Sequence, residues 1–156
     1  MRFLVRFLVL LFFIIITANA FSAVPTTSVV TKIEETGMLV IEVTGLRNMD
    51  GSVRIGIYDN QEDWLKKGLY EIRITANEKV VFKIPKLKYG EYSYLIFHDE
   101  NDDTQYNMDW FPVPKPKEGV WISNGALPSM GPPSFKDANF SFRNSYRLEK
   151  VILKYY

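Results

Sequence analysis

The sequence predicts an all-β protein built as a single sandwich of about seven strands. Three observations carry this prediction: short runs in which apolar and polar residues alternate, turn signals between those runs, and almost no helical period in residues 36–156. The chain has no cysteine, so its hydrophobic core must hold the fold without disulfides. One such core is feasible for a chain of this length.

The first twenty residues predict a secretory signal peptide. Arg2 and Arg6 precede an unbroken apolar run, residues 7–16, and small side chains follow at Ala18 and Ala20. A membrane-spanning helix needs about 20 apolar residues, and no cysteine for lipid attachment follows the run. We expect cleavage near Ala20 and a periplasmic or secreted mature chain that does not span the membrane. A retained membrane anchor is the alternative.

The charge balance gives no indication of a nucleic-acid partner. Without Arg2 and Arg6, 17 basic residues stand against 18 acidic ones. Binding to phosphates requires a cluster of lysines and arginines, whereas the basic residues here are spread along the predicted strands and turns.

Alternation defines the strands of the predicted domain, residues 36–156, which follows an N-terminal lead over residues 21–35. Val53, Ile55 and Ile57, for example, alternate with polar residues and glycine, as in a strand with one buried face. We expect strands over residues 38–44, 52–58, 70–75, 79–84, 91–98, 138–142 and 147–155, with a loop over 85–90. This pattern favours an immunoglobulin-like or transthyretin-like sandwich.

Residues 99–133 hold most of the prolines and glycines and show no sustained period, so we predict a long loop. Its aromatic residues indicate that it packs on the body of the protein in an ordered way. Tyr106, Trp110 and Trp121 are candidate ligand-binding residues, because exposed aromatic rings would stack on sugars; buried rings would instead anchor the loop.

Oxygen-bearing side chains recur at every second position at the start of this loop. They are Asp99, Asn101, Asp103, Gln105, Asn107 and Asp109. This pattern predicts a calcium site, because calcium takes such ligands from a tight loop. Thr104 and Trp110 depart from it, standing where a helix-loop-helix calcium loop has glycine and a bidentate carboxylate. The alternative is that Asp99 and Asn101 cap the turn through backbone hydrogen bonds.

His98 is the only histidine. A hydrolase would have to use it with Asp99 or Glu100, but Asp99 is adjacent in the strand and points to the opposite face. We therefore expect a structural role, in which one ring nitrogen of His98 donates to a loop carbonyl. The acidic residues of one polar loop also lack the separate environments that a pair of catalytic carboxyl groups needs.

Several short motifs together resemble a bacterial domain-of-unknown-function family, family 2141. The motifs are Gly90-Glu91-Tyr92, His98-Asp99-Glu100-Asn101, Ser123-Asn124, and Gly131-Pro132-Pro133-Ser134-Phe135 with Ala138 and Phe140. The resemblance covers most of the mature chain and implies an exported β-sandwich. The chain departs from the family pattern at Asp103 and Thr104, where Asn-Gly is usual, at Asn107, where Asp is usual, and at Pro112, where Gly is usual.

These observations favour a non-enzymatic binding or structural module of the cell envelope that presents the 99–133 loop to an unknown protein or glycan, with calcium as a possible organiser of the loop. A carbohydrate-binding module that uses the loop aromatics is one alternative. A hydrolase that uses His98 with a neighbouring carboxylate is the other.

Overall fold

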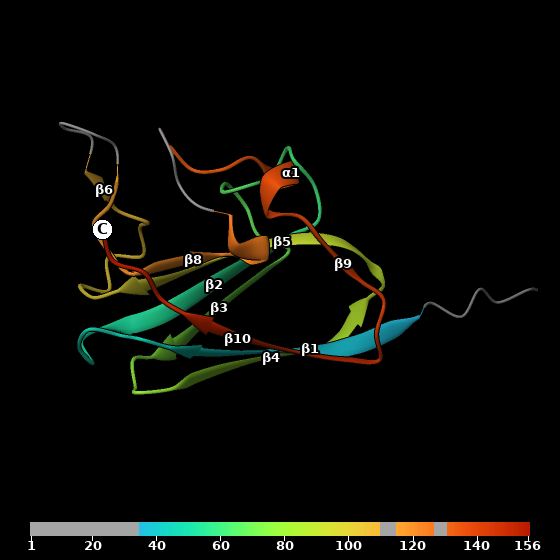
Figure 1. Cartoon of the computed structure of the whole chain (residues 1–156), viewed down its shortest axis with the longest axis horizontal. Coiled ribbons are helices and arrows are strands. Elements are labelled where there is room, and N and C mark those ends of the chain that lie inside the picture. Colours follow the sequence, from blue (N-terminus) through green and yellow to red (C-terminus); the bar gives the residue numbers. More distant parts are fainter. Residues whose placement is uncertain (1–34, 110–114, 127–130) are drawn as a thin grey trace, which may run out of the picture. The chain divides into compact units, whose positions relative to one another are not determined.

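The computed structural model describes residues 35–109, 115–126 and 131–156, which form ten β-strands (Figure 1). The all-β prediction is therefore confirmed, and two sheets pack around a common core. The predicted signal peptide, residues 1–20, and residues 21–34 of the predicted lead lie outside the described residues. Within the described part of the chain, no helix has the length and apolar character that crossing a membrane requires.

The smaller sheet has three strands in the order β10-β1-β4. They are β1 (Thr36–Thr44), β4 (Val80–Lys88) and β10 (Tyr146–Ile152). Strand β1 pairs antiparallel with β4 on one side and parallel with β10 on the other. The last strand of the chain therefore lies against the first.

The larger sheet has five strands, of which β3-β2-β5-β8 form a continuous path. They are β2 (Ser52–Tyr58), β3 (Tyr70–Thr75), β5 (Gly90–Asp99), β8 (Val120–Ile122) and β9 (Phe140–Phe142). Strand β2 pairs with β5 along most of its length, while β8 and β9 pair with separate parts of β5. Strand β5 is thus the centre of the sheet, and its last residue, Asp99, begins the acidic segment, residues 99–109.

Side chains from both sheets fill the space between them. Alternate residues of each strand point inward, so the apolar members of the period-2 pattern become the core. These include Leu39, Ile41, Val43, Val53, Ile55, Ile57, Phe82, Ile84, Tyr94 and Ile96.

A second apolar cluster lies on the other face of the five-stranded sheet. Leu95 and Phe97 of β5 belong to it, together with Trp64 from the turn over residues 59–68. Helix α1 (Phe135–Ala138), which starts with a capping box at Ser134, covers the same face (Figure 1). The connecting segments are therefore held by packing on the sheet.

The prediction of a loop over residues 85–90 is wrong, because β4 continues to Lys88. Pro85 suggested a strand end, but β4 is an edge strand, where a missing backbone N–H is tolerated. Lys86 has a φ of 55°, and the pairing with β1 shifts register between Ile84 and Leu87. This bulge carries the strand past the proline.

The prediction of an unbroken loop over residues 99–133 also needs correction. The segment contains the two-residue strands β6 (Met108–Asp109) and β7 (Lys115–Pro116), strand β8 and the 3-10 helix η1 (Ser123–Gly125). Elements this short carry no measurable period. Near the C-terminus, the predicted strand 138–142 shortens to β9 and the predicted strand 147–155 becomes β10, which ends at Ile152.

Candidate functional site

The alternation that fills the core places the remaining side chains of β2, β3 and β5 on the outer face of the five-stranded sheet. In one row of that face, Arg54 of β2 lies between Arg73 of β3 and Phe97 of β5. In the next row, Gly56 lies beside Leu95. Like charges directly opposite each other on paired strands are destabilising. The two arginines therefore need carboxylates nearby, and the acidic segment after β5 supplies them.

Asp99, the last residue of β5, supplies the first carboxylate. Its side chain is fully buried and accepts a hydrogen bond from Nε of Arg54. The backbone N–H groups of Asp103 and Thr104 donate to its two oxygens, each at 3.0 Å. A buried charge is tolerated when it is paired and fully hydrogen-bonded, so Asp99 fixes the first turn of the acidic segment against the sheet.

Asp102 supplies the second carboxylate. It accepts a hydrogen bond from the Ser52 hydroxyl and pairs with Nη2 of Arg73 at 2.6 Å. The hydrogen bond from Ser52, followed by that from Arg73, holds the pKa of Asp102 below its ordinary value. Each arginine of the cross-strand pair thus has its own aspartate.

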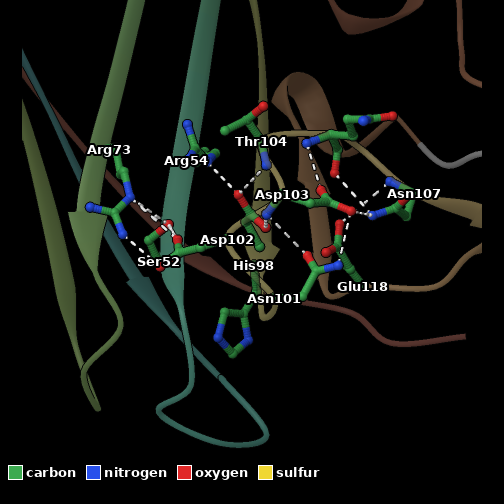
Figure 2. Close-up of polar contacts among 12 residues, drawn as sticks. Ser52, Arg54, Arg73, His98, Asn101, Asp102, Asp103, Thr104, Asn107 and Glu118 are labelled. Atoms are coloured by element: carbon green, nitrogen blue, oxygen red, sulfur yellow. Dashed lines mark hydrogen bonds and ion pairs between the residues drawn. The ribbon is translucent and has the colours of Figure 1, made fainter.

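Asp103 is the centre of the hydrogen bonds inside the acidic segment (Figure 2). Its Oδ2 accepts from the side-chain amides of Asn101 and Asn107, each at 2.9 Å, and its Oδ1 accepts from the backbone N–H of Gln105 at 2.8 Å. These bonds, led by that of Asn107, lower the pKa of Asp103. Thr104, which follows, has a φ of 71°. Its backbone has the left-handed conformation that glycine adopts most readily.

The structure brings together five of the six predicted calcium ligands. Asp99, Asn101, Asp103 and Asn107 contribute side chains to the network, and Gln105 contributes its backbone. Asp109 lies in β6, where its carboxylate is 3.3 Å from Nζ of Lys117. Within the described ranges, no three acidic or imidazole side chains are arranged to hold a metal ion. The hydrogen bonds are those of the turn-cap interpretation, and calcium stays a prediction.

Glu118, which lies between β7 and β8, joins this network and was missed by sequence reasoning. Its side chain is buried, and one of its oxygens lies 3.4 Å from the backbone N–H of Asn107. Burial, with a smaller contribution from the charges of Asp99 and Asp103, raises its pKa to about 7. Glutamate in a proline-rich segment has no pattern that would signal burial, so only the fold reveals this carboxyl group.

His98 points into the core, away from the acidic network (Figure 2). Its ring is fully buried, with Nε2 at 2.7 Å from the carbonyl oxygen of Asp50 and Nδ1 at 2.8 Å from Oη of Tyr155. Because a carbonyl only accepts, Nε2 carries the proton and Nδ1 accepts from the Tyr155 hydroxyl. Both ring nitrogens are engaged in joining β5 to the β1–β2 connection and to the C-terminal segment.

A groove of about 430 Å³ lies on the outer face of the five-stranded sheet. Gly56, Leu95 and Phe97 contribute to its floor, the turn over residues 59–68 forms one wall, and Thr104 and Tyr106 of the acidic segment belong to the other side. A Cβ on Gly56 would lie 2.6 Å from Oη of Tyr58, so the floor depends on glycine. The volume falls within the range of small-molecule sites, about 300–1,000 Å³.

The walls of this groove contain strained and unsatisfied groups. Leu65 and Thr104, one on each side, both have left-handed backbones, with φ of 59° and 71°. Such conformations are costly for these residue types and concentrate at functional sites. The hydroxyl of Tyr106 is buried and has no hydrogen-bond partner among the described residues. Buried hydroxyls without a partner are uncommon in native structures.

The three candidate ligand-binding aromatics have different outcomes. Tyr106 lines the groove. Trp121 packs against the main core, with Nζ of Lys154 at 5.6 Å from its ring centroid, and it borders only a hollow of about 10 Å³. Trp110 lies outside the described residues. Sequence reasoning did not select Arg54, Arg73 or Gly56. Their only signal in the sequence was their outward position on two adjacent strands.

Comparison with known families gives a match over most of the domain. Residues 41–148 match the model of a family described as an uncharacterised protein conserved in bacteria, DUF2141. The chain belongs to this family. The match runs from β1 to β10 and includes the whole acidic segment and every groove-lining residue of β2, β3 and β5. No curated protein and no solved structure matches this family member.

Proposed function

We propose that this protein is an exported, non-enzymatic binding module of the cell envelope, and that the groove on its five-stranded sheet is the ligand site. The observation that supports the proposal is the groove itself, which is lined on one side by Thr104 and Tyr106 of the 99–133 segment. The acidic segment is the support of this wall, because Asp99 and Asp102 tie it to Arg54 and Arg73.

The position of His98 supports a binding role over hydrolysis. A general base must contact the substrate or reach it through one water. The His98 ring is fully buried, and both nitrogens are within hydrogen-bond distance of protein oxygens. The carboxylates of the acidic segment are engaged by arginines and backbone N–H groups, as expected for parts that hold a loop in place.

Nuclear magnetic resonance of the ¹⁵N-labelled mature chain, starting at Phe21, tests the proposal. The probes are small molecules of several classes, including neutral sugars, organic acids, amines and amides. We expect at least one class to shift amide signals of Gly56, Leu95, Phe97 and Thr104 together. Substitution of Thr104→Tyr, which places a ring in the groove, is expected to abolish these shifts.

The matched control is Thr75→Tyr, an exposed threonine at the end of β3 that does not line the groove. It should leave binding unchanged. Signals that move only outside the groove, or groove shifts that persist in Thr104→Tyr, would contradict the proposal. Mass spectrometry of the protein recovered from the periplasm or medium tests export, with an expected N-terminus at Phe21.

A further inference from the structure

The outer row that contains Arg54 and Arg73 supplies more hydrogen-bond donors than the protein uses. A guanidinium group has five N–H donors. In the described part of the chain, Arg54 makes one side-chain hydrogen bond, through Nε to Asp99, and Arg73 uses Nε and Nη2 with Ser52 and Asp102. Both Nη groups of Arg54 and Nη1 of Arg73 are therefore left for another acceptor, and both residues line the groove.

Lys66, on the opposite wall of the groove, adds to this surplus, because its exposed ammonium group carries further donors. The one carboxylate in the lining, Glu71, already accepts from the backbone N–H of Gly68 at 2.9 Å. A ligand for such a site must bring acceptors.

The charges of the groove lining also favour a ligand with acceptor groups. The lining contains three cationic side chains, Arg54, Lys66 and Arg73, and one anionic side chain, Glu71. The aspartates that pair with Arg54 and Arg73, Asp99 and Asp102, are not part of the lining, and Asp99 is fully buried. Planar guanidinium groups recognise carboxylates through paired N–H donors. The apolar floor of Leu95 and Phe97 suits a ligand with a hydrocarbon body.

From these observations we propose that the groove binds a small organic carboxylate, with the anion against the free guanidinium donors of Arg54 and Arg73 and the hydrocarbon body on Leu95 and Phe97. This inference rests on the groove being the ligand site, and it adds the chemical class of the ligand.

Matched pairs of acids and amides test the class. Phenylacetate and hexanoate are compared with phenylacetamide and hexanamide, which keep the size and lose the charge, by titration of the labelled mature chain at low salt. We expect the acids to bind at least tenfold more tightly than their amides, and their affinity to fall as salt screens the interaction. Inorganic phosphate at the same ionic strength should not displace them at equal concentration.

The informative variant is Arg73→Gln. The Arg73 side chain is 47% exposed, so we expect the variant to fold. We expect it to weaken acid binding at least fivefold more than amide binding. Arg143→Gln is the control, because Arg143 is 62% exposed, pairs with Glu91 and lies outside the groove. It should change neither affinity. Melting temperatures of both variants verify that they are folded.

The outcomes separate the two proposals. Groove signals that respond equally to acids and amides, or acid affinity unchanged in Arg73→Gln, would overturn the carboxylate class while the groove stays a binding site. Preferential binding of phosphate would also overturn it and make the groove a site for inorganic anions. Probes that bind only elsewhere on the protein would overturn both proposals.

Discussion

Thr104 combines a backbone hydrogen bond with a strained backbone conformation. Its N–H donates to Asp99, and its backbone is left-handed, which for a residue other than glycine costs roughly 1–2 kcal/mol. Any residue other than proline at this position can make the hydrogen bond, because the donor is the backbone N–H. The strain arises from the threonine side chain.

Replacing Thr104 by glycine should therefore stabilise the protein. Relief of the left-handed strain is offset in part by the greater entropy of glycine in the unfolded chain, about 0.5–1 kcal/mol. We expect the free energy of unfolding in urea to rise by about 0.5–1 kcal/mol. The control Thr75→Gly, in a β-strand, should lower it. A loss of stability in Thr104→Gly would show that its side chain contributes more than its backbone costs.

The buried carboxyl group of Glu118 predicts that the free energy of unfolding depends on pH. Because burial raises its pKa from 4.5 to about 7, the folded chain holds a proton that the unfolded chain has released between these values. The free energy of unfolding then falls as pH rises through this window. Glu118→Gln removes this dependence. Between pH 5 and pH 8, the unsubstituted protein should therefore lose on the order of 1–3 kcal/mol of unfolding free energy relative to the variant.

Urea unfolding at pH 5 and pH 8 measures this difference. Exposed Glu62 provides the control, since Glu62→Gln should change stability equally at both pH values. Parallel pH profiles for the unsubstituted protein and Glu118→Gln would show that the carboxyl group titrates in the folded protein as it does in the unfolded chain.

Residue roles were predictable from sequence only where they are local. The spacing of Asp99, Asn101 and Asp103 indicated a hydrogen-bonded turn, and the structure contains one. The arginines that hold this turn lie 45 and 29 residues away from their aspartates, on other strands. Strand register decides such pairs, and register cannot be read from a single strand.

At the scale of elements, the sequence was informative where apolar and polar residues alternate. Strands β2 and β3 have the predicted bounds, 52–58 and 70–75. The bulge in β4 and the short strands within residues 99–133 were missed, because a proline in an edge strand and two-residue ladders leave no periodic signal. The groove was missed for the same reason, since its walls are turns.

The predicted calcium site is tested on the acidic segment as a whole. The calcium interpretation expects millimolar calcium, but not magnesium, to raise the melting temperature of the chelator-treated mature chain, because an ion that binds only the folded state stabilises it. The rise should disappear in Asp103→Ala and persist in Asp109→Ala, whose carboxylate pairs with Lys117.

A melting temperature that does not respond to calcium would assign the acidic segment to the turn-cap interpretation. In that case Asp103→Ala should still lower stability, because it removes the acceptor for two asparagine amides and one backbone N–H. The two results distinguish an ion site from a segment held by its own hydrogen bonds.

At the scale of the whole molecule, the hydrogen bonds of Tyr155 join segments from both sheets. The Tyr155 hydroxyl donates to His98 of β5 and accepts from the backbone N–H of Arg47 at 3.1 Å. His98 belongs to the larger sheet, Arg47 to the β1–β2 connection, and Tyr155 to the segment after β10. Removing this hydroxyl leaves the buried Nδ1 of His98 without a donor.

We expect Tyr155→Phe to lower the free energy of unfolding by about 1–3 kcal/mol, the cost of an unsatisfied buried polar group. The exposed neighbour Tyr156 is the control, and Tyr156→Phe should be close to neutral. Equal stabilities of the two variants in urea would show that the hydroxyl is not needed to hold the C-terminal segment.

The parallel pairing of β1 with β10 has a mechanical consequence. Because the strands run in the same direction, a force that pulls the N-terminal end of β1 away from the C-terminal end of β10 slides one strand along the other. The hydrogen bonds from Met38–Tyr146 to Thr44–Ile152 then share the load and must break together. Tethered by its two ends and stretched, the domain should resist extension as a shear clamp, with a lifetime set by its unfolding rate under load.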